Sequence, residues 1–368
     1  GLYEQGDVKG AYKLAAAHLA ESPEEIAEAE FHAGWYALRG LKDARTAARH
    51  FAAILDVASG QISSARAHYW LGRAAESGAG GKATEHYARA AKYPSTFYGQ
   101  LASARLDRKA LDIGYPQPTA QDRSRFAARE AVQAIGKLED AGSEWRAEML
   151  YRALAAELES PGELAILSAM AEKRGNHQTS LQVGKIAWNR GLDVAALAYP
   201  LGAVPHGANI KGSGKALAYS IARQESAFNK AAVSPANARG LLQLLPGTAK
   251  GVARRHGLPY SKDRLTSDAG YNATLGAYFL GEQISDFGGS YILTFIAYNA
   301  GPSRVPQWIE RFGDPRGRPL DEVIDWIELI PFTETRHYVQ RVMENYQIYK
   351  ARLGQPGDIE ADLRFGRR

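Results

Sequence analysis

The chain has 368 residues, 45% of them hydrophobic, so it can form more than one buried core and is not expected to be disordered or fibrous. Its 45 Lys and Arg residues are interleaved with 40 Asp and Glu residues, which argues against a nucleic-acid-binding protein. Cysteine is absent, which excludes disulfides and a cysteine nucleophile. The longest strongly apolar run, 291–298, is too short to cross a bilayer, so no transmembrane span is expected. Because the chain does not begin with Met, we expect that a leader has been removed.

The first half of the chain is predicted to be helical and repetitive. It is rich in Ala, Leu, Glu and Arg, which favour helices, and it lacks alternating apolar runs. Residues 34–40 match residues 69–75, an offset of about 35 that is typical of tetratricopeptide-type helical hairpins. Turn signals at 40–43 and 78–81 fall where such hairpins need them.

Two breaks interrupt the helical pattern and predict three domains. Pro116 and Pro118 interrupt helix formation, and the stretch 199–214 is dense in Gly and Pro. We therefore predict an all-α protein with a helical-repeat superhelix over 1–115, a helical linker domain over 116–205 and a third domain over 206–368.

A carboxylate on an apolar helix face is the first chemical signal. Ala218, Ile221, Ala222 and Glu225 lie at helical spacing, which places Glu225 among core-facing residues near the end of a helix. Burial can raise a carboxyl pKa by several units, much more than the helix dipole can, and a protonated Glu is a general acid. From its position alone, Glu225 could equally be a structural carboxylate paired with an Arg or capping a neighbouring helix.

Four further segments accompany Glu225 and favour the catalytic interpretation. They are 234–235, 239–246, 297–302 and 328–339. In order and spacing, these segments resemble the soluble lytic transglycosylases of the bacterial envelope, whose catalytic domain is similar to goose-type lysozyme. The resemblance covers residues 215–353, and it implies a lysozyme-like α-helical catalytic domain after the superhelix and linker.

The resemblance implies a role for individual residues. Glu225 would be the catalytic acid and base. Leu242 and Leu245 stand where the family commonly has Met, which affects pocket detail more than activity. The residues that would bind substrate are Ser234, Gln243, Leu245, Tyr298, Asn299, Glu328 and Tyr338.

The implied function is a peptidoglycan lytic transglycosylase that cleaves the MurNAc-GlcNAc bond without water and leaves a 1,6-anhydro-MurNAc end. The alternatives are a hydrolase of goose-lysozyme type and a noncatalytic glycan-binding or scaffold protein. The expected partners are peptidoglycan glycan strands, with envelope proteins docking on the repeats. We expect a periplasmic monomer with no nucleic-acid partner and no cofactor. No metal is expected, because His177, His256 and His337 are isolated from one another.

Overall fold

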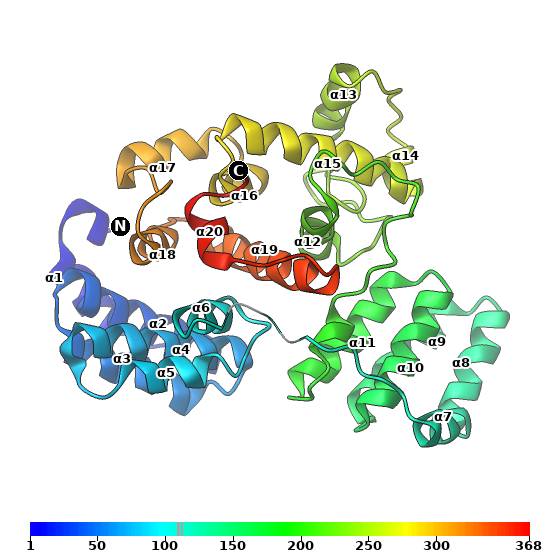
Figure 1. Ribbon diagram of the computed structural model, residues 1–368, viewed down its shortest axis with the longest axis horizontal. Coiled ribbons are helices and arrows are strands. Elements are labelled where there is room, and N and C mark those ends of the chain that lie inside the picture. The colour runs from blue at the N-terminus through cyan, green and yellow to red at the C-terminus, as the bar shows by residue number, and fades with distance from the viewer. Residues whose placement is uncertain (109–110, 112) are drawn as a thin grey trace. The chain divides into compact units, whose positions relative to one another are not determined.

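The computed structural model describes residues 1–108, 111 and 113–368, and the chain divides into two compact units, 1–111 and 112–368 (Figure 1). Helices are the regular elements of the described residues, and two isolated β-bridges join Arg239 to Val233 and to Leu244. The all-α prediction is confirmed. Among the described residues, no helix combines the length and the apolar character that a bilayer span requires.

The first unit is built from helical hairpins (Figure 1). Its helices are α1 (Val8–Ala16), α2 (Pro23–Trp35), α3 (Ala44–Val57), α4 (Gln61–Ala74), α5 (Ala83–Ala90) and α6 (Phe97–Arg105). The side chains of Ser22 and Asp43 accept hydrogen bonds from backbone amides of the first turns of α2 and α3, which fixes where these helices begin.

The repeat is longer than the predicted 35 residues. Pro23 and Gln61 begin α2 and α4 and lie 38 residues apart, while Ala44 and Ala83 begin α3 and α5 and lie 39 apart. A π-helical turn extends the first helix of each hairpin, over Tyr36–Gly40 and Ala75–Ala79.

This longer offset makes Gly34 equivalent to Gly72. A Cβ atom at Gly34 would lie 2.5 Å from the Phe51 ring, and one at Gly72 would lie 2.5 Å from the Tyr87 ring. Each hairpin therefore packs an aromatic ring directly against a glycine of its first helix, which allows the two helices to approach closely.

The second unit begins with five helices that share one apolar core. They are α7 (Ala120–Ala127), α8 (Glu130–Asp140), α9 (Glu144–Glu157), α10 (Pro161–Lys173) and α11 (His177–Asn189). Ile135, Leu154, Leu164 and Val183 come from four of these helices and are all at most 4% exposed. This segment is helical, as the sequence predicts, and the chain turns between α10 and α11 at residues 174–176.

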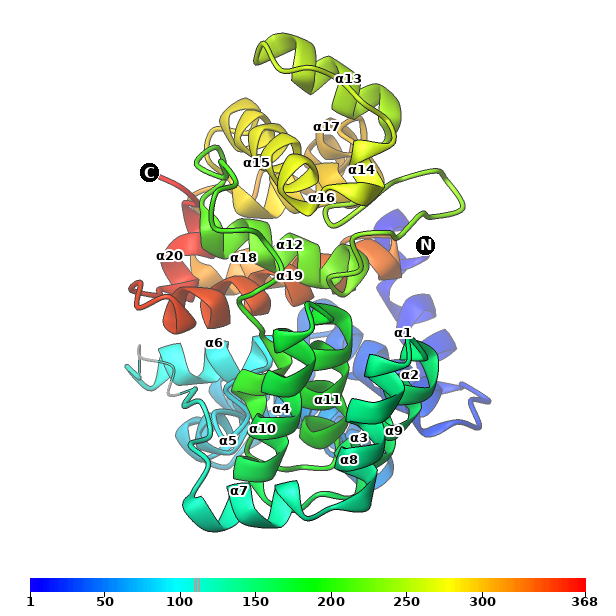
Figure 2. The same ribbon diagram turned by 90° about the vertical axis from the view of Figure 1, so that its right-hand side faces the viewer.

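The remainder of the second unit is a further helical cluster. Its helices are α12 (Lys215–Ser226), α13 (Pro246–Arg255), α14 (Arg264–Ser267), α15 (Ala269–Asp286), α16 (Tyr291–Ala300), α17 (Arg304–Phe312), α18 (Leu320–Glu328), α19 (Thr333–Arg352) and α20 (Ile359–Arg364). Helix α12 packs along α19, and both views show the two side by side (Figures 1 and 2). This pair positions the candidate site.

Several contacts join residues 198–201, which follow α11, to the helices after residue 206. The Arg223 guanidinium donates to the Ala198 carbonyl at 2.8 Å and stacks over the Tyr199 ring at 4.0 Å. The Tyr349 hydroxyl donates to the Pro200 carbonyl at 3.1 Å, and the Tyr219 hydroxyl donates to the Leu201 carbonyl. These bonds hold α12 and α19 against the end of the linker segment. The division into three domains, at 115 and 205, stays a prediction.

Candidate active site

Glu225 lies in the last turn of α12, on the stripe that the sequence predicts. Ala218, Ile221 and Ala222 are fully buried on that stripe. The Arg223 guanidinium, two residues before Glu225, also donates to Asn345 of α19 at 3.0 Å. The end of α12 is therefore fixed on one side by the linker and on the other by α19.

The Glu225 carboxyl accepts a hydrogen bond from the Tyr338 hydroxyl, which lies 2.7 Å from Oε1. The pKa of Glu225 is raised to about 7: burial is the largest cause, the Tyr338 hydrogen bond acts in the opposite direction, and the negative charge of Glu334 adds a smaller upward shift. The sequence analysis expects burial to be the dominant cause, and the structure agrees. Near neutral pH, Glu225 can thus hold a proton and can also release it.

The chain leaves α12 through two strained residues. Ala227 has φ = 49° and Phe228 has φ = 65°, both in the left-handed region that non-glycine residues rarely adopt. Phe228 is buried and lies against Tyr219, with the ring centroids 5.9 Å apart. This anchored bend ends the helix directly after Glu225. Such strain is typical of functional sites, where surrounding packing holds it in place.

The loop 239–244 is a tight turn that carries Gln243. Gln243 also has a positive φ, 49°, and its side-chain amide donates to the carbonyls of Gly240 at 2.9 Å and Ala232 at 3.2 Å. Gly240 has φ = 75°, and a Cβ atom there would lie 2.0 Å from the Leu265 carbonyl oxygen. Only glycine fits that position.

The Asn272 side chain of α15 holds this loop through hydrogen bonds to its backbone. It is fully buried, and its Oδ1 accepts from the Leu242 amide at 2.9 Å. Its Nδ2 donates to the carbonyls of Arg239 at 2.8 Å and Leu265 at 3.0 Å. A single side chain thereby bonds three backbone groups, of which the Arg239 carbonyl also accepts from the Leu244 amide at 3.0 Å.

Helix α16 brings Tyr298 and Asn299 to the same region. The Tyr298 hydroxyl donates to the Leu242 carbonyl at 2.5 Å, which ties α16 to the loop 239–244. Burial raises the pKa of Tyr298 well above its usual value, and the nearby Glu225 charge acts in the same direction. Asn299 Oδ1 accepts from the Thr335 hydroxyl at 2.7 Å, which links α16 to the first turn of α19.

Ser234 and Leu245 lie at the two ends of the segment that contains this loop. Ser234 Oγ accepts from the Ala238 amide at 3.0 Å and so closes the preceding turn. Leu245 is 46% exposed at the start of α13, a large apolar side chain left open to solvent. Both can reach a ligand, and their role as substrate contacts stays a prediction.

Glu328, which the resemblance assigns to substrate binding, is buried and bound by other side chains of the protein. Its side chain is 3% exposed, and its Oε1 accepts from Gln340 Nε2 at 2.8 Å. Its Oε2 lies 3.8 Å from Arg336 Nε. Arg336 is buried and pairs with Glu328, although Glu334 is nearer in sequence, because the first turn of α19 directs the Arg336 side chain inward.

Two residues that matter here were missed at the sequence level. Glu334 is the acidic residue whose charge raises the Glu225 pKa, a role that the sequence analysis did not assign. Asn272 could have been found, because it lies at i−3 and i−4 from Leu275 and Gly276 on a buried face of α15, the same signal that identifies Glu225.

Among the described residues, no three His, Asp or Glu side chains are grouped closely enough to hold a metal ion. His177 instead pairs with Glu172 at 2.8 Å, and His256 pairs with Glu282 at 2.8 Å.

Replacing Asn272 with Leu is expected to lower the free energy of unfolding by about 2 kcal/mol or more, because the Leu242 amide and the Leu265 carbonyl would lose their side-chain partner. Asn272→Asp should also destabilise, since it keeps only the acceptor for the Leu242 amide. Urea unfolding measures both, with Asn209→Asp, an exposed amide, as the control at under about 1 kcal/mol. Equal stability of the Asn272 and Asn209 variants would contradict this assignment.

Glu225→Gln is expected to change stability in a pH-dependent way. The folded pKa of about 7 lies above the ordinary value of 4.5, so the stabilising effect of neutral Glu225 is complete below pH 4.5 and is lost as pH rises through 7. The glutamine variant avoids this loss and should become more stable than wild type above pH 7, by up to about 3 kcal/mol. Thermal melts from pH 4.5 to 8.5 check this, and a stability difference that does not change with pH would exclude a buried, raised carboxyl.

Comparisons with known proteins agree with this geometry. Residues 204–320 match the model of the transglycosylase SLT domain, and residues 329–357 match that of the soluble lytic transglycosylase helical domain. A relative from Haemophilus influenzae is 33% identical over 260 residues, 69% of this chain and 42% of that protein. The soluble lytic murein transglycosylase of Escherichia coli K12 is 38% identical over 152 residues, 41% of this chain and 23% of that protein. The chain thus spans less than half the length of these two relatives.

Solved structures show the same fold. The chain resembles an inactive mutant of the lytic transglycosylase Slt from Pseudomonas aeruginosa with a TM-score of 0.64 and 25% identity, over 97% of this chain and 62% of that one. The 70 kDa soluble lytic transglycosylase from Escherichia coli gives a TM-score of 0.64 at 22% identity, over 100% of this chain and 64% of that one. The domain matches, the relatives and the shared fold confirm the resemblance of this chain to the soluble lytic transglycosylases.

Proposed function

We propose that this chain is a peptidoglycan lytic transglycosylase, which cleaves the β-1,4 bond between MurNAc and GlcNAc and leaves a 1,6-anhydro-MurNAc end. The observation that carries the proposal is Glu225, a partly buried carboxyl with a pKa of about 7 that accepts a hydrogen bond from Tyr338. A carboxyl of that pKa is protonated in a useful fraction of molecules at neutral pH. It can therefore protonate the glycosidic oxygen that leaves MurNAc C1.

The assignment of the base in the second step follows from the surroundings of the other two nearby acids, Glu328 and Glu334. Most glycosidases need two carboxyl groups, one as acid and the other as nucleophile or base. Here Glu328 is engaged by Gln340 and Arg336, and Glu334 is exposed. We therefore assign both steps to Glu225, which would deprotonate the MurNAc C6 hydroxyl after it has protonated the leaving group.

The remaining steps fall to the substrate itself. The N-acetyl group of MurNAc would stabilise the oxocarbenium-like centre at C1, and the C6 oxygen would then attack C1 and close the anhydro ring. Because nucleophile and electrophile belong to one sugar, holding that sugar in the right conformation supplies the orientation advantage that attack by free water lacks.

The surrounding residues would hold the sugar and the acid. Tyr338 positions the Glu225 carboxyl, and Tyr298 holds the loop 239–244 beside it. The proposed contacts to substrate are Ser234, Gln243, Leu245, Asn299 and Glu328, together with the two tyrosines.

We further propose that the chain works as a monomer in the periplasm on peptidoglycan strands. The repeat unit, 1–115, would offer surface to the polymer or to envelope proteins, and the linker, 116–205, would support the catalytic domain, 206–368. The contacts of Arg223 and Tyr349 with the linker carbonyls support that mechanical role.

Glu225→Gln is expected to fold normally and to lose activity on purified sacculi by a factor of 10⁴ or more, because general acid and base catalysis contributes roughly 10² to 10⁴ per step and one residue serves both. Mass spectrometry of the wild-type muropeptides should show 1,6-anhydro ends and no new reducing ends. Products one water heavier would instead indicate the lysozyme-like hydrolase. Residual activity of Glu225→Gln within about tenfold of wild type would remove Glu225 from the mechanism.

Glu334→Gln is expected to move the alkaline limb of the pH profile to lower pH. The Glu334 charge raises the pKa of Glu225, so its removal lowers that pKa, and Glu225 then loses its proton at lower pH. The rate of muropeptide release measured from pH 5 to 9 reports this limb. Glu310→Gln, an exposed acid on α17, is the matched control, and an identical shift in both variants would exclude a specific effect of Glu334.

A further inference from the structure

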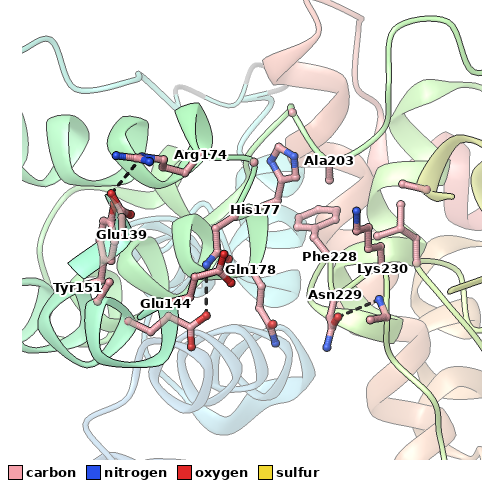
Figure 3. Close-up of a pocket in the computed structure, with 18 of the residues that line it drawn as sticks. Glu139, Glu144, Tyr151, Arg174, His177, Gln178, Ala203, Phe228, Asn229 and Lys230 are labelled. Atoms are coloured by element: carbon pink, nitrogen blue, oxygen red, sulfur yellow. Dashed lines mark hydrogen bonds and ion pairs between the residues drawn. The ribbon is translucent and has the colours of Figure 1, made fainter. Parts of the chain in front are cut away.

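The second unit contains a pocket of about 750 Å³ between the linker helices and the segment that follows α12 (Figure 3). We call it the junction pocket. Glu144 and Glu148 of α9, with Asn176 and Gln178 at the start of α11, lie on one side. Asn229 and Lys230, which follow the strained Phe228, lie on the other side (Figure 3). None of these residues belongs to the site around Glu225.

Most charges at the rim of the junction pocket are already neutralised. Arg174 pairs with Glu139 at 3.2 Å and with Asp140 at 2.8 Å, and His177 is occupied by Glu172. Among the described residues, the side chains of Glu144 and Lys230 have no hydrogen-bond or ion-pair partner. Glu148 accepts only from the neutral Asn176 amide, at 3.2 Å, so its charge is not compensated. The pocket therefore offers two free negative charges on one wall and one free positive charge on the other.

These features select a class of ligand. A sugar would need an open aromatic face, but Phe228 and Tyr151 are 4% and 2% exposed and present almost no ring surface. A simple anion would be repelled by the two carboxylates, which outnumber the single free cation. A ligand with an ammonium group at one end and a carboxylate at the other satisfies both walls, and the amides of Asn176, Gln178 and Asn229 suit peptide groups between them.

We propose that the junction pocket binds a short peptide that carries both a side-chain ammonium group and a carboxylate. Its source would be the stem peptide of the glycan, an assignment that rests on the proposed function, while a free peptide of the same chemistry is the other source. Lys230 lies five residues after Glu225, across the bend at Ala227 and Phe228. A peptide bound there would contact the segment that directly follows α12, the helix that carries Glu225.

Isothermal titration of the full chain tests binding directly. The probe is N-acetyl-L-Ala-D-isoglutaminyl-L-Lys, which carries one side-chain ammonium group and one carboxylate, and the control probes carry an acetylated lysine side chain or an amidated C-terminus. We expect a Kd of about 1 mM or tighter for the first probe and at least tenfold weaker binding of both controls. No binding of the first probe, or equal binding of all three, would overturn the proposal.

Variants locate the binding. The double variant Glu144→Gln with Glu148→Gln, and separately Lys230→Gln, should each weaken the first probe at least tenfold. Glu157→Gln, an exposed acid on α9 that does not line the pocket, is the matched control and should bind like wild type. Thermal melts check that every variant is folded. Unchanged binding by the pocket variants would place the peptide elsewhere and overturn the assignment.

A second measurement separates the two sources. If the stem peptide is the ligand, the pocket variants should cleave peptide-bearing glycan at least fivefold more slowly than wild type and peptide-free glycan at the wild-type rate. If both substrates are cleaved at wild-type rates while binding of the probe is lost, the pocket serves a free peptide and the stem-peptide assignment is overturned. Because titration needs no cleavage, an inactive enzyme that still binds the probe would contradict the proposed function and leave the peptide site supported.

Discussion

The hydrogen bond between the Tyr338 hydroxyl and the partly buried Glu225 carboxyl is the interaction on which the candidate site of the second unit depends. Burial of Glu225 and the charge of Glu334 favour the protonated form, while the Tyr338 hydroxyl favours the ionised form, and the balance sets a pKa of about 7. A more open site would leave Glu225 ionised, and a site without Tyr338 would make the proton harder to release. The packing of α12 along α19 matters because it fixes both partners of this balance.

That balance is maintained by costly local structure. Ala227, Phe228 and Gln243 all adopt left-handed backbone conformations without being glycine, which costs roughly 1 to 3 kcal/mol each. The buried Phe228 ring and the three hydrogen bonds of Asn272 offset part of this cost and hold the bend and the loop in one conformation. The strained residues and the contacts that hold them thus lie near Glu225, where a displaced carboxyl would impair catalysis most.

The sequence predicted those features that depend on local periodicity. The all-α fold and the helix that carries Glu225 on its apolar stripe follow from spacing, and so does the direction of the Glu225 pKa shift, which needs only burial. Features that depend on how a side chain is oriented in the tertiary structure could not be predicted from spacing. The inward turn of Arg336 toward Glu328 is set by how α19 begins, and no spacing rule reports that. The repeat offset was underestimated, since the matching helices begin 38 and 39 residues apart.

The hydrogen bonds from Arg223, Tyr219 and Tyr349 to the carbonyls of residues 198–201 bear on how such proteins can be recombined. These bonds use backbone acceptors at the end of the linker, so their geometry is set by the path of the chain more than by any side chain that could be exchanged. A chimera joined at residue 206 would have to reproduce that path to within hydrogen-bonding distance, or leave a guanidinium and two hydroxyls without acceptors in a buried seam. A junction near residue 112, between the two compact units, avoids this demand, so shuffling of modules should be tolerated there far more readily.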